Sequence, residues 1–187
     1  MRIVGISGNV KRPSKTKQLV ETASGHLAAR IGVQASIYDF VEMGNQLPAN
    51  LDARSAGPLA REALKAVEQC DALLVATPVY KGSYAGILKH FFDFLDPLVL
   101  VDRPVLLMAT GGGYRHALVV EHQLRPLFGF FSARTIAHGV YAADSDFQDG
   151  KLVDENVGRR LASAVDQLVS MLPGAARSRV PMPAHAG

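Results

Sequence analysis

Hydroxyl and basic side chains concentrate in one short segment near the N-terminus, residues 7–16, which contains no acidic residue. The helix predicted to follow has no carboxylate before Glu21 and carries Lys15 and Lys17 in its first turn. Helix N-termini usually favour acidic residues, because their free N–H groups and the helix dipole attract negative charge. A bound phosphate would account for this reversal. We therefore predict a phosphate site formed by Ser7, Ser14, Lys15 and Thr16.

The end of this segment, Ser14-Lys15-Thr16, resembles the end of the P-loop of nucleoside-triphosphate-binding proteins, but Ser14 stands where that motif requires glycine. No G-x-G-x-x-G pattern follows the first predicted strand, which disfavours a dinucleotide site of the Rossmann type. A simpler alternative needs no ligand, since Ser14 could cap the following helix in a solvated turn.

A second segment, residues 77–84, follows a buried apolar run and has the sequence Thr-Pro-Val-Tyr-Lys-Gly-Ser-Tyr. Pro78 and Gly82 would hold an irregular backbone whose N–H and C=O groups can face a planar ligand, and Tyr80 could cover its ring. The alternative is a tight turn between a strand and a helix, with Ser83 as the helix cap and Tyr80 packed on the surface.

A third segment begins with Thr110-Gly111-Gly112-Gly113 and ends at His116. Three successive glycines are costly in backbone entropy, and they make sense where a ligand must approach the backbone closely. Glycine-rich loops also permit sharp turns without a ligand. The first segment would bind a phosphate, and the other two would form walls for a flat ring. Together they favour a mononucleotide over a dinucleotide.

The elements that must position these segments alternate along the chain. Short apolar runs of strand length alternate with longer segments in which apolar residues recur every four positions. This pattern predicts strands at residues 2–7, 33–39, 71–77, 104–110 and 133–141. It predicts helices at residues 15–31, 58–69, 84–95 and 116–130, and a last helix capped by Asp154. Residues 40–57 lack periodicity and are expected to form a loop.

Five strands that alternate with five helices imply a parallel sheet covered on both faces, so the predicted fold is a doubly wound α/β/α sandwich. In such folds ligands bind beyond the carboxyl ends of the strands. The segments that follow the first, third and fourth strands are therefore expected to meet at one site.

Length and composition fit one globular domain, expected over residues 1–172, with a flexible tail at residues 173–187. The formal net charge is +3 and the basic residues are scattered, which argues against a nucleic-acid partner. Cys70 is the only cysteine and no metal-ligand spacing is present, so neither a disulfide nor a metal site is expected. The sequence shows no signal peptide and no membrane-spanning run, so a cytoplasmic location is expected.

The three segments described above make the chain similar to a known protein family. It resembles the NAD(P)H-dependent FMN reductases of the flavodoxin-like superfamily, in particular the reductase components of two-component alkanesulfonate or methanesulfonate monooxygenases. Besides the first loop, the matching stretches are residues 77–89, 110–116, 124–127 and 138–141. The resemblance implies a flavodoxin-like three-layer sandwich whose five-stranded parallel sheet has the order 2-1-3-4-5.

The resemblance also implies roles for the site residues. The FMN phosphate would be held by Ser7, Ser14, Lys15 and Thr16. The flavin itself would contact Pro78, Val79, Tyr80, Lys81, Gly82 and Ser83, and also Thr110, Gly111, Gly112 and Gly113. In the sulfonate-linked branch a π-type bulge, associated with FMN as a passing substrate, often interrupts the fourth helix. His122 is the candidate for that bulge here, and the alternative is a plain helical residue at an interface.

The expected reaction transfers hydride from NADPH or NADH to FMN, and reduced FMN would then pass to a partner flavin-dependent monooxygenase. Because the cofactors carry the chemistry, no catalytic side chain is assigned. Lys81, Arg115 and His116 are candidates for binding the phosphates of the nicotinamide nucleotide. The resemblance implies a homotetramer or a homodimer. Two alternatives are a quinone, azo or chromate reductase with fixed FMN, and a flavodoxin-like electron carrier, which the positive net charge disfavours.

Overall fold

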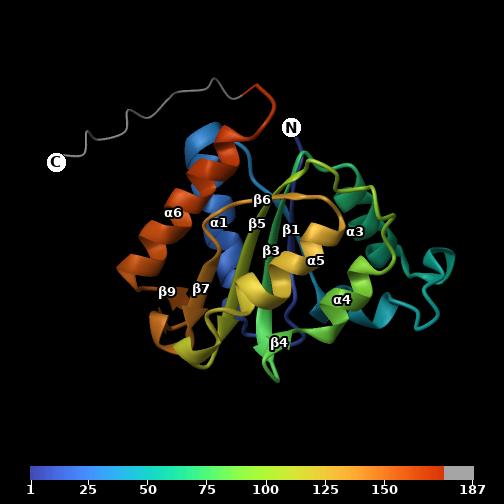
Figure 1. Cartoon of the computed structure of the whole chain (residues 1–187). Coiled ribbons are helices and arrows are strands. Elements are labelled where there is room, and N and C mark those ends of the chain that lie inside the picture. The colour runs from blue at the N-terminus through green and yellow to red at the C-terminus, as the bar shows by residue number, and fades with distance from the viewer. Residues whose placement is uncertain (175–187) are drawn as a thin grey trace.

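The computed structural model describes residues 1–174, so the expected tail at residues 173–187 lies outside the described residues from position 175 onward (Figure 1). The strands are β1 (Ile3–Ser7), β2 (Ser36–Asp39), β3 (Ala72–Tyr80), β4 (Ser83–Tyr84), β5 (Pro104–Gly111), β6 (Arg134–Thr135), β7 (Val140–Ala143), β8 (Phe147–Gln148) and β9 (Lys151–Leu152). The α-helices are α1 (Lys15–Ile31), α2 (Phe40–Met43), α3 (Pro58–Glu68), α4 (Gly86–Phe92), α5 (Arg125–Phe130) and α6 (Glu155–Ser170).

The main sheet confirms the predicted strand order. Its path runs β2-β1-β3-β5-β6, and every pair along it is parallel. Strand β7 pairs in parallel with the end of β5, so β6 and β7 together stand where one fifth strand was predicted. This is the flavodoxin-like order 2-1-3-4-5. The short strand β4 adds an antiparallel pair with the end of β3.

At the break in the fifth strand, between β6 and β7, arginine side chains form hydrogen bonds with the backbone. The Arg125 guanidinium donates hydrogen bonds to the carbonyls of Ile136 and Ala137, at 3.0 and 3.4 Å. The Arg160 side chain donates to the carbonyl of Gly139 at 2.6 Å. These arginines satisfy backbone groups that a continuous strand would have paired with a neighbour, and the sequence pattern gives no sign of them.

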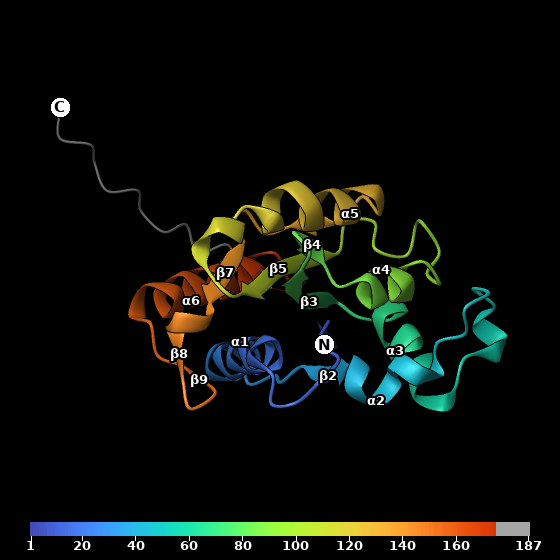
Figure 2. The ribbon, with the colours of Figure 1, turned by 90° about the horizontal axis from the view of Figure 1, so that it is seen from below.

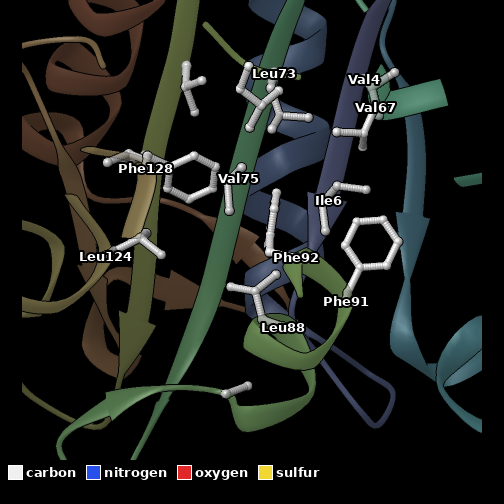
Figure 3. Packing of buried hydrophobic residues seen from close by; sticks show 14 of the residues in the cluster. Val4, Ile6, Val67, Leu73, Val75, Leu88, Phe91, Phe92, Leu124 and Phe128 are labelled. Atoms are coloured by element: carbon white, nitrogen blue, oxygen red, sulfur yellow. The ribbon is translucent and has the colours of Figure 1, made fainter. Parts of the chain in front are cut away.

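Helices cover both faces of the sheet (Figure 2). Apolar side chains of α1 and α6 pack on one face, in a core that includes Leu19, Leu27 and Leu161. Helices α3, α4 and α5 pack on the other face, where Phe91, Phe92 and Phe128 meet the strand residues (Figure 3). The helix predicted at residues 15–31 is confirmed at both ends, and Asp154 caps α6 as expected.

Three predicted segments differ from the structure. The loop predicted at residues 40–57 contains α2 and two short 3₁₀ turns, Gly44–Gln46 and Ala53–Ser55. The helix predicted at 84–95 begins only at Gly86, because residues 83 and 84 pair with β3. The helix predicted at 116–130 consists of a 3₁₀ turn, Tyr114–His116, then a π-helix, Val120–Leu124, and then α5.

Cys70 is fully buried at the end of α3. Burial disfavours the charged thiolate and raises the pKa of the Cys70 thiol to about 11. The side chain therefore serves as a small apolar residue of the core.

Candidate functional site

A cleft of about 740 Å³ lies beyond the carboxyl ends of β1, β3 and β5. One wall is the β1–α1 loop with the first turn of α1, and another is formed by the ends of β3 and β5. The turn between β8 and β9 contributes to a third wall. Among the predicted site residues, the cleft is lined by Ser14, Lys15, Thr16, Pro78, Val79, Tyr80, Thr110, Gly111 and Gly112. Ser7, Lys81, Gly82, Ser83 and Gly113 are not among its lining residues.

The β1–α1 loop is braced by its own polar side chains. The buried Ser7 hydroxyl donates to Oδ1 of Asn9 at 2.7 Å, and Nδ2 of Asn9 reaches the carbonyl of Lys11 at 3.3 Å. Oγ of Ser14 accepts a hydrogen bond from the N–H of Lys17 at 3.1 Å, so Ser14 is the N-cap of α1. The capping role considered from sequence is therefore present, and the hydroxyl hydrogen of Ser14 is still free to donate.

The first turn of α1 is tied to the end of β5. The hydroxyl groups of Thr16 and Thr110 lie 2.6 Å apart and are both buried. This bond fixes the helix N-terminus, with its free N–H groups, against the strand that leads into the glycine segment.

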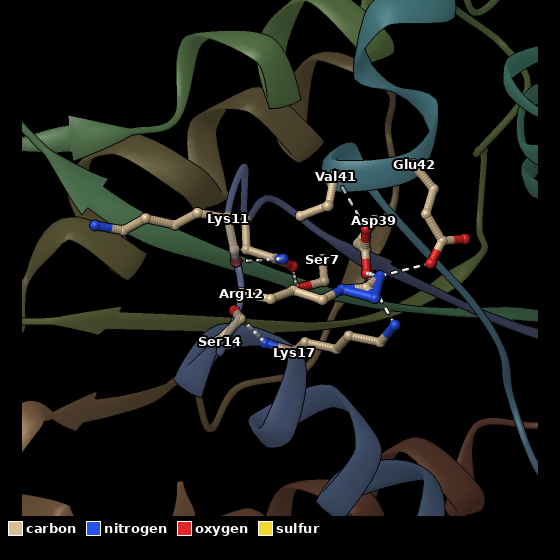
Figure 4. Close-up of polar contacts among 9 residues, drawn as sticks. Ser7, Lys11, Arg12, Ser14, Lys17, Asp39, Val41 and Glu42 are labelled. Carbon is tan, nitrogen blue, oxygen red and sulfur yellow. Dashed lines mark hydrogen bonds and ion pairs between the residues drawn. The ribbon is translucent and has the colours of Figure 1, made fainter.

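The basic residues of this region have carboxylate partners, which the sequence did not suggest. Arg12 and Lys17 both contact Oδ2 of Asp39, at 2.6 and 2.8 Å, and Arg12 also contacts Glu42 (Figure 4). Lys15 contacts Oδ1 of Asp144 at 2.8 Å. A phosphate is thus not needed to explain the reversed charge of this helix start, because acidic residues from β2, α2 and the segment after β7 balance it.

Asp39 is the centre of this network. Its side chain is 1% exposed, and Oδ1 also accepts a hydrogen bond from the N–H of Val41 at 3.0 Å. Burial alone would raise the pKa of Asp39, but the hydrogen bond and charge of Lys17, with the charge of Arg12, outweigh it and lower the pKa. The carboxylate is therefore charged at neutral pH and holds both cations in place.

Residues 77–84 form a β-hairpin, whereas an irregular loop was expected. Val79 and Tyr80 pair with Tyr84 and Ser83 across the two-residue turn Lys81-Gly82. Both turn residues have positive φ, 52° and 83°, which is typical of tight hairpin turns. Lys81, Gly82 and Ser83 are placed at the tip, and Pro78 to Tyr80 face the cleft. Tyr80 is 42% exposed there.

In the glycine segment, one glycine is required by a contact within the protein and another lines the cleft. A Cβ atom at Gly111 would collide with the hydroxyl of Tyr141, which donates a hydrogen bond to the carbonyl of Gly113 at 2.7 Å. Gly111 is thus explained by contact with Tyr141. A Cβ atom at Gly112 would meet nothing within 4 Å, and Gly112 lines the cleft.

The π-helix that was considered for His122 is present. It spans Val120–Leu124, and the N–H of Arg125 donates to the carbonyl of Val120. Pro126 has no N–H to continue an α-helical ladder at this point, which favours the wider turn. The His122 side chain is exposed and does not line the cleft. Gln123 accepts a hydrogen bond from the Ser83 hydroxyl at 3.2 Å, which connects the π-helix with the hairpin tip.

Arg115 and His116, considered for the nicotinamide nucleotide, contact each other at 3.2 Å and lie outside the cleft lining. The lining residues that the prediction missed are Asn9, Lys11, Arg12, Pro13, Lys17, Gln18, Glu21, Asp144, Asp149, Gly150 and Lys151. For Lys11, Arg12 and Lys17, the absence of acid between residues 7 and 20 was the usable signal. Nothing in the sequence links β8 and β9 to this cleft.

Within residues 1–174, no group of three or more His, Cys, Asp or Glu side chains is placed to hold a metal ion. In the same part of the chain, no helix has the length and apolar character needed to cross a membrane.

Comparison with known proteins shows the family of the chain. The model of the NADPH-dependent FMN reductase family matches residues 1–148. The NADH-dependent FMN reductase SfnF of Pseudomonas fluorescens is 41% identical over 89% of this chain and 89% of its own length. An FMN reductase (NADPH) of Pseudomonas aeruginosa is 42% identical over 92% of this chain and 93% of its own.

A solved structure of a similar protein supports the same family. The apo form of an NADH:FMN oxidoreductase superposes with a TM-score of 0.83 and 32% identity, covering 92% of this chain and 90% of that one. The chain belongs to the NADPH-dependent FMN reductase family.

Proposed function

We propose that the protein transfers hydride from NADH or NADPH to FMN bound in the cleft, and that the reduced FMN then leaves to serve a flavin-dependent monooxygenase. The observation that carries this proposal is the continuity of the cleft, which joins the capped N-terminus of α1 to the walls formed by residues 78–80 and 110–112. A phosphate fits the first region and a flat ring the second.

The donor groups of the first region suit a phosphate. The first turn of α1 presents free N–H groups, and Ser14 keeps a hydroxyl hydrogen to donate. Lys15 adds a positive charge at the cleft wall. Because the Ser7 hydroxyl is used on Asn9, we assign Ser7 to holding the loop in shape.

When bound, FMN would supply the two-electron acceptor for the hydride of the reduced nicotinamide, and solvent would supply the accompanying proton. The chain's own work is to position the two rings and to exclude water. The backbone N–H of Gly112, just beyond the end of β5, is suited to stabilise charge at one edge of the flavin. We assign no side chain as acid or base.

The decisive experiment follows the absorbance of NADH, and separately of NADPH, while free FMN is added to the purified protein. We expect oxidation that saturates with FMN, and comparison of the two donors gives the preference. Oxidation that needs a quinone while FMN stays bound would favour a reductase with fixed FMN. Absence of turnover with either donor would favour an electron carrier and contradict the proposal.

The family likeness supports further proposals about context. We propose a homodimer or homotetramer, because Leu118 and Phe130 are 63% and 67% exposed beside the π-helix. Reliance on reduced nicotinamide and a lone buried thiol suit the cytoplasm. We also propose that residues 1–172 form the reductase domain, since Leu172 still packs into the core.

A further inference from the structure

Three cations stand at the start of α1, and their carboxylate partners differ in burial. Arg12 and Lys17 contact Asp39, whose side chain is 1% exposed. Lys15 contacts Asp144, whose side chain is 60% exposed. The two kinds of pair are therefore expected to respond differently when an anion enters the cleft.

Figure 4 shows the contacts that Arg12 and Lys17 make with Asp39. If Arg12 and Lys17 turned towards a ligand, a charged carboxylate would be left buried with only the N–H of Val41 as a partner. Leaving a buried charge uncompensated is strongly unfavourable. Arg12 and Lys17 therefore remain paired with Asp39 and contribute positive charges at fixed positions in the cleft wall.

The pair of Lys15 with Asp144 is exchangeable. Exposed ion pairs contribute little, because water and salt screen them. Nζ of Lys15 is 2.8 Å from Oδ1 of Asp144 and 3.3 Å from its backbone carbonyl, so both hydrogen bonds come from one exposed residue, and the Phe147 ring lies 5.9 Å away. A phosphate carries more charge and more acceptor oxygens than this carboxylate. Lys15 is thus the cation that can move to a phosphate at small cost.

We propose that Asp144 is a built-in competitor for the FMN phosphate: it holds Lys15 when FMN is absent and must release it when FMN binds. This inference rests on the proposed function, because it assumes FMN in the cleft. Its consequence is a lowered affinity, which suits a protein that passes reduced FMN on. Asp144 is then an affinity-determining residue that acts through Lys15.

Flavin fluorescence titrations of the full-length protein test this proposal. Asp144→Asn is expected to tighten FMN binding by about 3- to 5-fold, the scale of an exposed ion pair. Riboflavin, which lacks the phosphate, is expected to bind both proteins equally. Lys15→Met is expected to weaken FMN binding, and adding Asp144→Asn to it is expected to give a gain of less than about 2-fold, from screened repulsion alone.

Two further variants separate this mechanism from general electrostatics. Asp149→Asn removes a charge from the same cleft without touching Lys15, and a gain of less than about 2-fold is expected from screened repulsion alone. Asp166→Asn breaks another exposed pair, with Arg30 at the far end of α1, and is expected to change nothing.

Equal gains from Asp144→Asn and Asp149→Asn would overturn the proposal, and so would a gain from Asp144→Asn that keeps its full size without Lys15. If the wild-type protein binds FMN and Asp144→Asn leaves the affinity unchanged, only this inference fails. If the wild-type protein binds no FMN, the proposed function fails with it.

Discussion

Ser14 combines a structural and a binding role in one hydroxyl group. Its oxygen accepts a hydrogen bond from the N–H of Lys17 and so begins α1, while the hydroxyl donates to no partner within the described residues. The sequence suggested a cap and a phosphate ligand as alternatives. The geometry allows both at once, because a hydroxyl group accepts and donates through different parts.

Substitution of Ser14 can separate these roles. Ser14→Ala is expected to lower the free energy of unfolding by about 1 kcal/mol through loss of the cap and to weaken FMN binding. Ser14→Asp keeps a good cap but places a negative charge where the phosphate is proposed, so stability should be retained while FMN binding is lost. Urea denaturation and flavin titration measure the two effects. FMN binding by Ser14→Asp at wild-type strength would refute the phosphate assignment.

Asp39 gives the fold a pH dependence with a definite sign. Its pKa in the folded protein lies below the ordinary value of 3.8, so its stabilisation is full above that value and is lost as pH falls through the folded pKa. Asp39→Asn is expected to cost about 1–3 kcal/mol at neutral pH, since a buried charged acceptor is removed. The deficit relative to wild type should shrink in acid.

Urea denaturation at a series of pH values checks this expectation. Glu42→Gln is the matched control, because Glu42 pairs with the same Arg12 through a side chain that is 60% exposed. It should change stability much less than Asp39→Asn. An Asp39→Asn deficit that stays constant down to low pH would contradict the assigned ionisation.

At the scale of elements, the spacing of apolar residues in the sequence located the regular helices and the buried strands. Helix α1, helix α3 and the buried strands β3 and β5 follow directly from apolar spacing. The hairpin at residues 77–84 and the break between β6 and β7 do not follow from this spacing. The hairpin depends on two turn residues, Lys81 and Gly82, at positive φ, and arginine side chains from other elements contact the backbone at the break. In the same way, two carboxylates far along the chain, Asp39 and Asp144, complete the charge pattern seen near residue 15.

The contact between β5 and β7 at the cleft can be tested directly. Gly111→Ala is expected to cost about 1–3 kcal/mol, because its Cβ collides with the Tyr141 hydroxyl. Tyr141→Phe removes that hydroxyl, so the double variant should be more stable than the sum of the single changes predicts. Thermal denaturation of the four proteins completes the cycle. Strict additivity would show that another contact requires glycine at position 111.

At the scale of the whole molecule, the exposed apolar side chains concern assembly. Phe130 and Leu118 lie at opposite ends of the segment that contains the π-helix, and both are largely exposed in the single chain. If this face is covered by a second copy, Phe130→Ser should shift the protein towards smaller species. Light scattering during size-exclusion chromatography measures the change. A wild-type protein that runs as a monomer would contradict the proposed assembly, and Leu51→Ser, at a residue between α2 and α3 that is 48% exposed, is the control.

The buried thiol of Cys70 makes the wild-type chain a ready-made background for site-specific labelling. With a pKa of about 11 and no exposed surface, it should resist maleimide reagents at neutral pH while the protein stays folded. A cysteine introduced at the hairpin tip or beside Asp144 would then be the single reactive thiol. A dye placed there would report, one molecule at a time, when a flavin enters or leaves the cleft.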